Sequence, residues 1–400
     1  MVLLQPPKTV CSLNFLQTLK IAQALADLKP SYVRLPGGND LAGPIIPERF
    51  IWNNTIGLLV NRPGRRGIWT GYNTEGFGLI ELLTFAEDIG ATPILVVYAG
   101  YSFDGKAVPH NQLQPYIDEV VKELDVLTTS VSDNRMGALR AHLGPSQPFN
   151  IKYVESDNED WIGPTPSAYS YRWPAFYDVL SQKYPNITFI ATTTKSINSP
   201  PAVDDHDYQV PLFFIQNFFI NDDDSKINDA FTTGRLDFPS IKSSVAELIY
   251  RIGFERNSDI IIGGCYVLVL QNIDNTQWTP NLIVFNADLI VKSTSYLAQK
   301  MFGENLGNIM LNFTATNSTI THQFVQKREE GVSKFGNLYF VATKCTNDNT
   351  LIVKLASVDS NDIAIKIQTQ GSTTSSVGLA YILTAGPDIV PSTIYNNWYC

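Results

Sequence analysis

The sequence has little positive charge, few cysteines and no long apolar run. Its 400 residues include 29 Lys and Arg against 38 Asp and Glu, which gives a formal net charge of −9. Binding to phosphates requires a basic face, so we expect no nucleic-acid partner. No apolar run approaches the ~20 residues that a membrane-spanning helix needs, so we expect no membrane partner either.

The cysteines and the N-terminal residues exclude further classes. Cys11, Cys265, Cys345 and Cys400 are widely spaced and form no CxxC pattern, so no metal site is expected, while a disulfide among them stays open. Residues 1–8 lack the basic n-region and long apolar h-region of a signal peptide. Glycosylation sequons, which tilt the prediction mildly toward secretion, occur at Asn53, Asn186, Asn312 and Asn317.

What the sequence does contain is the composition of a globular chain, with 44% hydrophobic and 17% charged residues. From about residue 14 to 300, helical and strand-like patterns alternate, which predicts a parallel α/β architecture. The expected helices are 16–28, 78–89, 114–126, 173–184 and 243–253. The expected strands are 31–35, 92–98, 149–154, 186–191 and 259–262.

After about residue 305 the pattern changes to short β runs separated by Ser, Thr, Asn and Asp. The clearest runs are 338–342, 351–355 and 363–367, and they predict an antiparallel sandwich. We therefore expect a barrel-type domain at 1–300 and a C-terminal β-sandwich domain at 301–400.

The stretch from Phe149 to Trp161 is the most informative motif. An apolar run that predicts a buried strand breaks into a polar cluster ending in Asn158-Glu159. In a (β/α)8 barrel, reactive groups lie at the C-terminal ends of the strands. A glutamate placed there can protonate a leaving glycosidic oxygen while the asparagine binds a sugar hydroxyl. A solvated acidic loop explains this motif equally well when it is considered alone.

Several longer strings, taken in order along the chain, resemble fungal family 51 glycoside hydrolases, the α-L-arabinofuranosidases. The strings that carry the resemblance are Val33-Arg34-Leu35-Pro36-Gly37-Gly38-Asn39, Trp52-Asn53-Asn54-Thr55-Ile56-Gly57, Asn61-Arg62-Pro63-Gly64-Arg65, Tyr72-Asn73-Thr74-Glu75-Gly76-Phe77-Gly78, Gly137-Ala138-Leu139-Arg140, Lys152-Tyr153-Val154-Glu155 through Asn158-Glu159-Asp160-Trp161, Tyr171-Arg172-Trp173-Pro174, Asp205-His206-Asp207-Tyr208, Ser244-Val245-Ala246-Glu247, Glu255-Arg256-Asn257-Ser258-Asp259 and Trp278-Thr279-Pro280-Asn281-Leu282-Ile283. Asn337 to Lys344 is similar to part of the family's C-terminal β-sandwich.

The resemblance implies a (β/α)8 TIM-type barrel followed by an antiparallel sandwich, and a retaining mechanism with two carboxylates about 5 Å apart. Glu159 would be the acid/base and Asn158 its sugar-hydroxyl partner. Arg34 and Asn39 would line the subsite for the arabinose ring. No metal and no cofactor is implied.

The resemblance also assigns residues near the nucleophile. His206 and Tyr208 match the family's His-x-Tyr pair, although His206 alone, amid three aspartates, would more often be a surface histidine. Trp278 is either a stacking platform for a sugar or a core tryptophan.

Three departures from the family pattern concern activity. The family places its nucleophile in a Gly-Glu-Tyr-like strand, but residues 211–233 contain no glutamate. The aspartates there are Asp222, Asp223, Asp224 and Asp229. The family also has strands before the helix at 16–28, where this chain has about a dozen residues, so the barrel is expected to be incomplete. Finally, Glu155-Ser156-Asp157-Asn158 replaces a smaller Gly-containing turn that the family has at this point.

These observations leave alternatives. The chain is either an arabinofuranosidase-type hydrolase that releases terminal arabinofuranose from plant-wall polysaccharides, or a family member without a nucleophile that binds such sugars or nothing. A third alternative is that the chain is a shortened product of an active gene. The expected partner is an arabinose-containing polysaccharide or oligosaccharide and the expected location, by resemblance, is extracellular; the oligomeric state stays open.

Overall fold

The computed structural model describes residues 12–69, 71–162, 166–218, 227–233, 239–275, 279–312, 314–316, 321–323, 338–358, 363–370, 375, 378–384 and 392–396. The chain divides into two compact units. The first comprises residues 1–11, 29–206 and 226–229, and the second comprises 12–28, 207–225 and 230–400.

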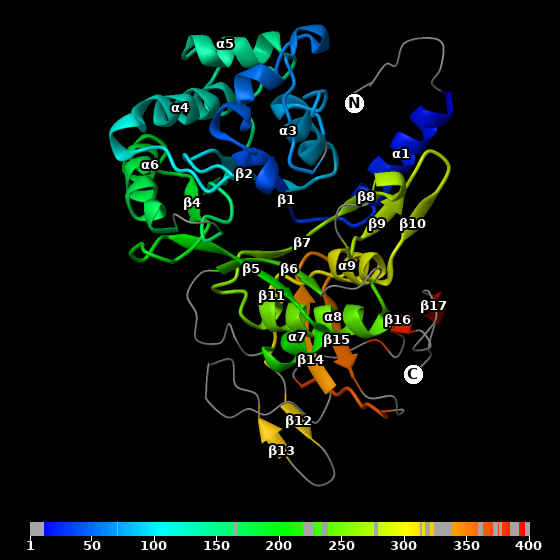
Figure 1. The fold of residues 1–400 in the computed structure, drawn as a ribbon. Helices are drawn as coiled ribbons and strands as arrows, with labels where there is room; N and C mark the ends of the chain where they lie inside the picture. Colours follow the sequence, from blue (N-terminus) through cyan, green and yellow to red (C-terminus); the bar gives the residue numbers. More distant parts are fainter. Residues whose placement is uncertain are drawn as a thin grey trace. The chain divides into compact units, whose positions relative to one another are not determined.

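A parallel sheet forms the centre of the first unit (Figure 1). Its strands β1 (Tyr32–Leu35), β2 (Thr92–Val97), β3 (Tyr153–Ser156), β4 (Thr188–Ala191) and β5 (Ala202–Gln209) are hydrogen-bonded in chain order. Each neighbouring pair in this series is parallel. Because parallel strands end at the same edge of a sheet, the segments that follow β1, β3 and β4 are brought together there.

Helices connect these strands, as a β/α barrel requires. They are α2 (Asn39–Ala42), α3 (Leu79–Asp88), α4 (Gln114–Thr128), α5 (Arg135–His142) and α6 (Tyr169–Lys183). The buried face of α3 contributes Leu79 and Leu83 to the same core as Leu95 and Val97 of β2. Gly78 comes directly before α3 and packs against Thr55. A Cβ atom at position 78 would lie 1.9 Å from the Thr55 carbonyl oxygen.

The second unit contains the remaining helices and the antiparallel strands. Its helices are α1 (Ser12–Ala26), α7 (Pro211–Gln216), α8 (Ile241–Arg256) and α9 (Thr294–Glu304). Ser240 caps α8, since its hydroxyl accepts a hydrogen bond from the Ser243 amide. None of the described helices is both long and apolar enough to cross a membrane.

Several small sheets complete the second unit. Strand β7 is Gly263–Tyr266, and β8 (Leu270–Asn272), β9 (Ile283–Phe285) and β10 (Ile290–Lys292) form one sheet. An antiparallel sheet joins β11 (Ile309–Met310), β14 (Leu338–Cys345) and β15 (Thr350–Ser357). The antiparallel pairs are β12 (Thr314–Thr316) with β13 (Thr321–Gln323), and β16 (Ala380–Thr384) with β17 (Ser392–Asn396). Strand β6 (Ile227–Thr233), like β5, contains residues of both units.

Most predicted elements are present, and the exceptions have local causes. The strand expected at 149–154 begins only at Tyr153, because the Phe149 amide already donates to the Leu127 carbonyl. The strand expected at 259–262 is wrong, since α8 ends in a turn in which the Ile260 amide donates to the Asn257 carbonyl. The strand expected at 363–367 is also wrong, and its isoleucines are exposed rather than packed.

The cysteine question is partly answered. Neither Cys265 nor Cys345 forms a disulfide. Cys11 and Cys400 lie outside the described residues. The division of the chain at about residue 300 stays a prediction.

Candidate active site

The turn after β3 carries the Asn158-Glu159 pair. Two of its residues have left-handed backbone angles, with φ 69° at Asp157 and φ 51° at Glu159. The Asp157 amide donates to the Val97 carbonyl at 2.9 Å, and the Glu159 amide donates to Thr192 Oγ1 at 2.8 Å. The turn is therefore fixed to the segments that end β2 and β4, which places Glu159 at the C-terminal edge of the sheet.

Asn158 is held between two partners from the β1 end of the sheet. Arg34 Nη2 donates to Asn158 Oδ1 at 2.9 Å, and Asn158 Nδ2 donates to Asn39 Oδ1 at 2.9 Å. Because a guanidinium can only donate, the contact with Arg34 decides which side of the Asn158 amide is the oxygen. Asn39 is the first residue of α2, directly after the turn that ends β1.

Arg34 also pairs with two carboxylates below this turn. Its Nε and Nη2 atoms each lie 2.5 Å from an oxygen of Glu155, and its Nε lies 3.5 Å from Asp204 Oδ2. Glu155 is fully buried on β3, and that burial raises its pKa to about 7 although Arg34 opposes the shift. The bidentate pair fixes the guanidinium plane and therefore the direction of its contact with Asn158.

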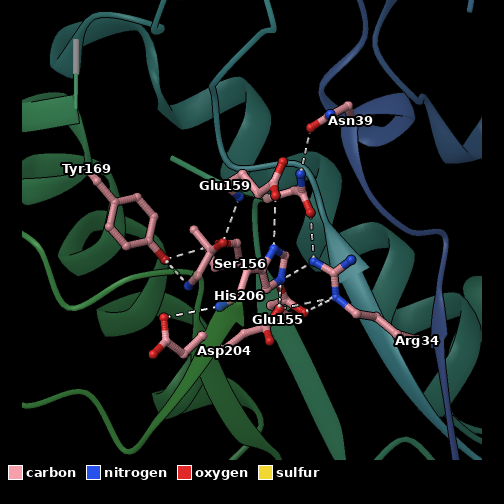
Figure 2. A network of polar contacts seen from close by, with 11 residues as sticks. Arg34, Asn39, Glu155, Ser156, Glu159, Tyr169, Asp204 and His206 are labelled. Carbon is pink, nitrogen blue, oxygen red and sulfur yellow. Dashed lines mark hydrogen bonds and ion pairs between the residues drawn. The ribbon is translucent and has the colours of Figure 1, made fainter. Parts of the chain in front are cut away.

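His206 joins Glu159 to Asp204 (Figure 2). Its Nδ1 lies 3.0 Å from Glu159 Oε1, and its Nε2 lies 2.7 Å from Asp204 Oδ2. Burial acts to lower the pKa of His206, but the Asp204 charge and hydrogen bond outweigh it and raise that pKa to about 10. The ring is therefore an imidazolium at neutral pH and donates to both carboxylates.

Two aromatic side chains support the turn from its sides. The Tyr169 hydroxyl donates to the Ser156 carbonyl at 3.0 Å and accepts from the Thr192 amide at 3.1 Å (Figure 2). The Trp161 ring meets the His206 ring edge to face, with centroids 5.2 Å apart. Contacts of Tyr169 and Trp161 thus hold the segments on both sides of Glu159.

The structure brings together Arg34, Asn39, Asn158, Glu159 and His206, all within the first unit. The interpretation of His206 as a surface histidine is wrong, because its side chain is only 3% exposed. A carboxylate held by a cationic imidazole, beside an amide held by an arginine, can exchange a proton with a sugar oxygen.

Other predicted residues lie elsewhere. Tyr208 is in the second unit and its side chain is 40% exposed. Trp278, Asp222, Asp223 and Asp224 lie outside the described residues, and only the backbone of Asp229 is described, in β6. The expectation that the nucleophile is missing therefore stays a prediction.

Sequence reasoning missed the residues that support the pair. Asp204 precedes His206 by two positions on one strand, and such residues point to the same face, so the spacing could have identified it. Glu155 and Thr192 gave no comparable signal, because their contacts depend on the register of β3 and β4. Among the described residues, no group of His, Cys, Asp and Glu is arranged to hold a metal ion.

Similarity to known proteins covers nearly the whole chain. The family profile of the α-L-arabinofuranosidase 1 domain matches residues 24–226, and that of the α-L-arabinofuranosidase C-terminal domain matches 230–392. A probable α-L-arabinofuranosidase A of Aspergillus flavus is 37% identical over 370 residues, covering 88% of this chain and 56% of the relative. α-L-Arabinofuranosidase 1 of Arabidopsis thaliana is 32% identical over 307 residues, covering 73% of this chain and 44% of that protein.

Solved structures agree with these matches. An arabinose-bound family 51 α-L-arabinofuranosidase superposes with a TM-score of 0.81 at 32% identity, covering 95% of this chain and 63% of that one. The enzyme from Thermotoga maritima, at 16% identity and a TM-score of 0.66, shares the fold. The fold is thus an incomplete TIM-type barrel followed by an antiparallel C-terminal domain, and the chain spans about half the length of the curated relatives it matches. Together, the two family profiles and these relatives show that the chain belongs to the α-L-arabinofuranosidases of glycoside hydrolase family 51.

Proposed function

We propose that this chain carries the acid/base half of an α-L-arabinofuranosidase active site, which releases terminal α-L-arabinofuranosyl residues from plant cell-wall polysaccharides. The observation that carries the proposal is the geometry around Glu159. Its carboxylate is fixed by His206, and the neighbouring Asn158 amide is fixed by Arg34 and Asn39. The arabinose-bound relative supports the class of sugar.

In the proposed mechanism, Glu159 protonates the leaving glycosidic oxygen while a second carboxylate, which is not identified among the described residues, bonds to the anomeric carbon. Glu159 then removes a proton from the water that displaces this carboxylate. The imidazolium of His206 keeps the Glu159 side chain in one direction. Asn158 donates to or accepts from a sugar hydroxyl, and Arg34 and Asn39 line the ring subsite. Tyr208 and Trp278 remain proposed sugar contacts.

We further propose that the protein acts outside the cell and is glycosylated. The sequons at Asn53, Asn186 and Asn312 support this proposal because these asparagines are exposed. The fourth, Asn317, lies outside the described residues. The family resemblance is the second support.

Sugar binding without turnover is a second candidate, and one observation favours it. Residues 211–233 contain no glutamate where the family has its nucleophile. Covalent attack needs accurate placement of the carboxylate, so an aspartate there is not a simple replacement. A shortened product of an active gene would show the same gap, and comparing the genomic and transcript sequences around Asn221–Thr233 tests that case.

Hydrolysis of 4-nitrophenyl α-L-arabinofuranoside tests the proposed function. We expect Glu159→Gln to lose turnover by orders of magnitude, while Glu87→Gln, a change of an exposed glutamate on α3, retains it. Azide should restore product release in Glu159→Gln, because it attacks a glycosyl-enzyme without a general base. Equal turnover by Glu159→Gln and the parent chain would overturn the assignment, and a folded chain that only binds arabinose would favour the second candidate.

A further inference from the structure

A buried arginine binds the acid/base turn at both of its ends. Arg172 lies on α6 and its side chain is completely buried. Its Nη1 donates to Asp157 Oδ2 at 2.7 Å and to the Ala99 carbonyl at 2.8 Å, and its Nη2 pairs with Asp160 Oδ1. Asp157 and Asp160 flank the Asn158-Glu159 pair in the sequence, so one guanidinium bridges the residues on either side of it.

The turn that Arg172 bridges has an unfavourable backbone conformation. Asp157 and Glu159 both have positive φ, at 69° and 51°, in the region that favours glycine. Such conformations persist only where surrounding contacts over-determine them, and they concentrate at functional sites. Here the Arg172 contacts supply that constraint at positions 157 and 160.

The loop after β2 completes the same arrangement. The Tyr101 amide donates to Asp157 Oδ2 at 3.1 Å, and the Tyr101 hydroxyl donates to the Ile162 carbonyl. Between Ala99 and Tyr101 lies Gly100, whose φ of 98° is strained for any side chain and whose added Cβ would lie 3.2 Å from Arg172 Cδ. The close approach of this loop to Arg172 thus depends on Gly100.

We propose that Arg172 is a positioning residue that fixes the direction of the Glu159 carboxyl by holding Asp157 and Asp160 in one buried cluster. The first part of this proposal, that Arg172 holds the turn in one conformation, rests on the contacts described above. The second part, that this conformation affects proton transfer by Glu159, rests on the proposed function. Because small displacements of a reacting group cost up to about 100-fold in rate, loss of this clamp should reduce proton transfer without any direct contact between Arg172 and the sugar.

The charges in this cluster determine which substitutions can test the proposal. Burial, followed by the neighbouring Asp160 charge, raises the pKa of Asp157 well above its usual range. An asparagine is a close substitute for Asp157, since it adds no buried charge, keeps the acceptor oxygen and tolerates a positive φ. Arg172→Lys keeps a positive charge but loses the fork that reaches both aspartates.

Hydrogen exchange tests the locking without any need for activity. We expect amide protection across 157–162 to fall at least tenfold in Arg172→Lys, to fall less in Asp157→Ala and to be retained in Asp157→Asn. Arg135→Lys, a change of an exposed arginine on α5, is the control. Unchanged protection in Arg172→Lys would overturn the proposal; if that variant does not fold, unchanged protection in Asp157→Ala would do so.

The catalytic part is tested with two aryl α-L-arabinofuranosides that differ in leaving group, 4-nitrophenol and the poorer phenol. A misplaced acid harms the poor leaving group more, so Arg172→Lys should lower kcat/KM for the phenyl glycoside about tenfold more than for the 4-nitrophenyl glycoside. An equal loss for both would contradict a positioning role. If the parent chain hydrolyses neither, the proposed function fails, and the exchange experiment alone decides whether Arg172 locks the turn.

Discussion

Glu159 and Asp204 share one imidazole: His206 Nδ1 lies 3.0 Å from Glu159 Oε1 while its Nε2 lies 2.7 Å from Asp204 Oδ2. The ring is almost fully buried and positively charged at neutral pH, since its pKa is raised to about 10. This relationship ties the protonation of the site to the stability of the first unit.

His206 should stabilise the fold in a pH-dependent way. Its folded pKa of about 10 exceeds its ordinary value of 6.5, so the stabilisation is fully present below about pH 6.5 and is lost as the pH rises through about 10. We expect His206→Gln to cost about 3 kcal/mol at pH 6 and much less at pH 10, as measured by urea unfolding. The exposed His142→Gln is the control, and a cost that does not change with pH would contradict this account.

Asp204 should be the main source of the His206 charge. Its carboxylate is the largest contribution that raises the His206 pKa, against burial, which lowers it. In Asp204→Asn we expect the imidazole pKa to fall well below its value in the parent chain, because burial remains while the larger of the two anionic contributions is gone. NMR titration of the histidine ring signals measures this, and a ring that still titrates above pH 9 would show that Glu159 alone keeps it charged.

Glu155 should make the fold less stable as the pH rises from acid to neutral. Burial raises its folded pKa to about 7 from 4.5, so its contribution is fully present below about pH 4.5 and is lost as the pH passes 7. Between pH 5 and 8, the free energy of unfolding of the parent chain should fall by about 2–3 kcal/mol relative to Glu155→Gln. Parallel pH curves for the two proteins would mean that Arg34 fully compensates the burial.

Gly78 should tolerate no side chain. A Cβ atom there would lie 1.9 Å from the Thr55 carbonyl oxygen, whereas one at Gly71 would meet nothing within 4 Å. We expect Gly78→Ala to lower the free energy of unfolding by about 1–3 kcal/mol and Gly71→Ala to have little effect. Thermal unfolding of the two variants provides the comparison; equal melting temperatures would indicate that the Thr55 segment moves aside at little cost.

The sequence predicts the strands that carry the site better than it predicts the contacts that support the site residues. Alternating helical and strand patterns identify β1, β2 and β4, and the rule that reactive groups lie at the C-terminal ends of parallel strands identifies the Asn158-Glu159 pair. The patterns predict no strand at β5, so only the family resemblance places His206 near this pair. The predicted strand ends are less accurate. Strand β3 begins only at Tyr153, because the Phe149 amide donates to the Leu127 carbonyl instead of to a neighbouring strand.

The supporting contacts could not be predicted in the same way. The bond from Glu159 to Thr192 depends on strand register, and the positive φ at Asp157 depends on tertiary contacts rather than on local preference. Arg172 is one of several polar residues on α6, and its spacing from Tyr169 and Phe176 places it on the buried face of that helix, but the spacing does not indicate which acidic residues it meets there.

The aspartate at position 157 also constrains which sequence changes this chain can accept, and in what order. A glycine there would adopt the left-handed backbone without strain and would place no carboxylate in the interior. With Asp157 and Asp160 both buried against Arg172, replacing the arginine first leaves two acidic groups without their cation, whereas replacing Asp157 first leaves a simple ion pair. Sequence drift at this turn is therefore expected to begin at position 157, with Arg172 free to vary only afterwards.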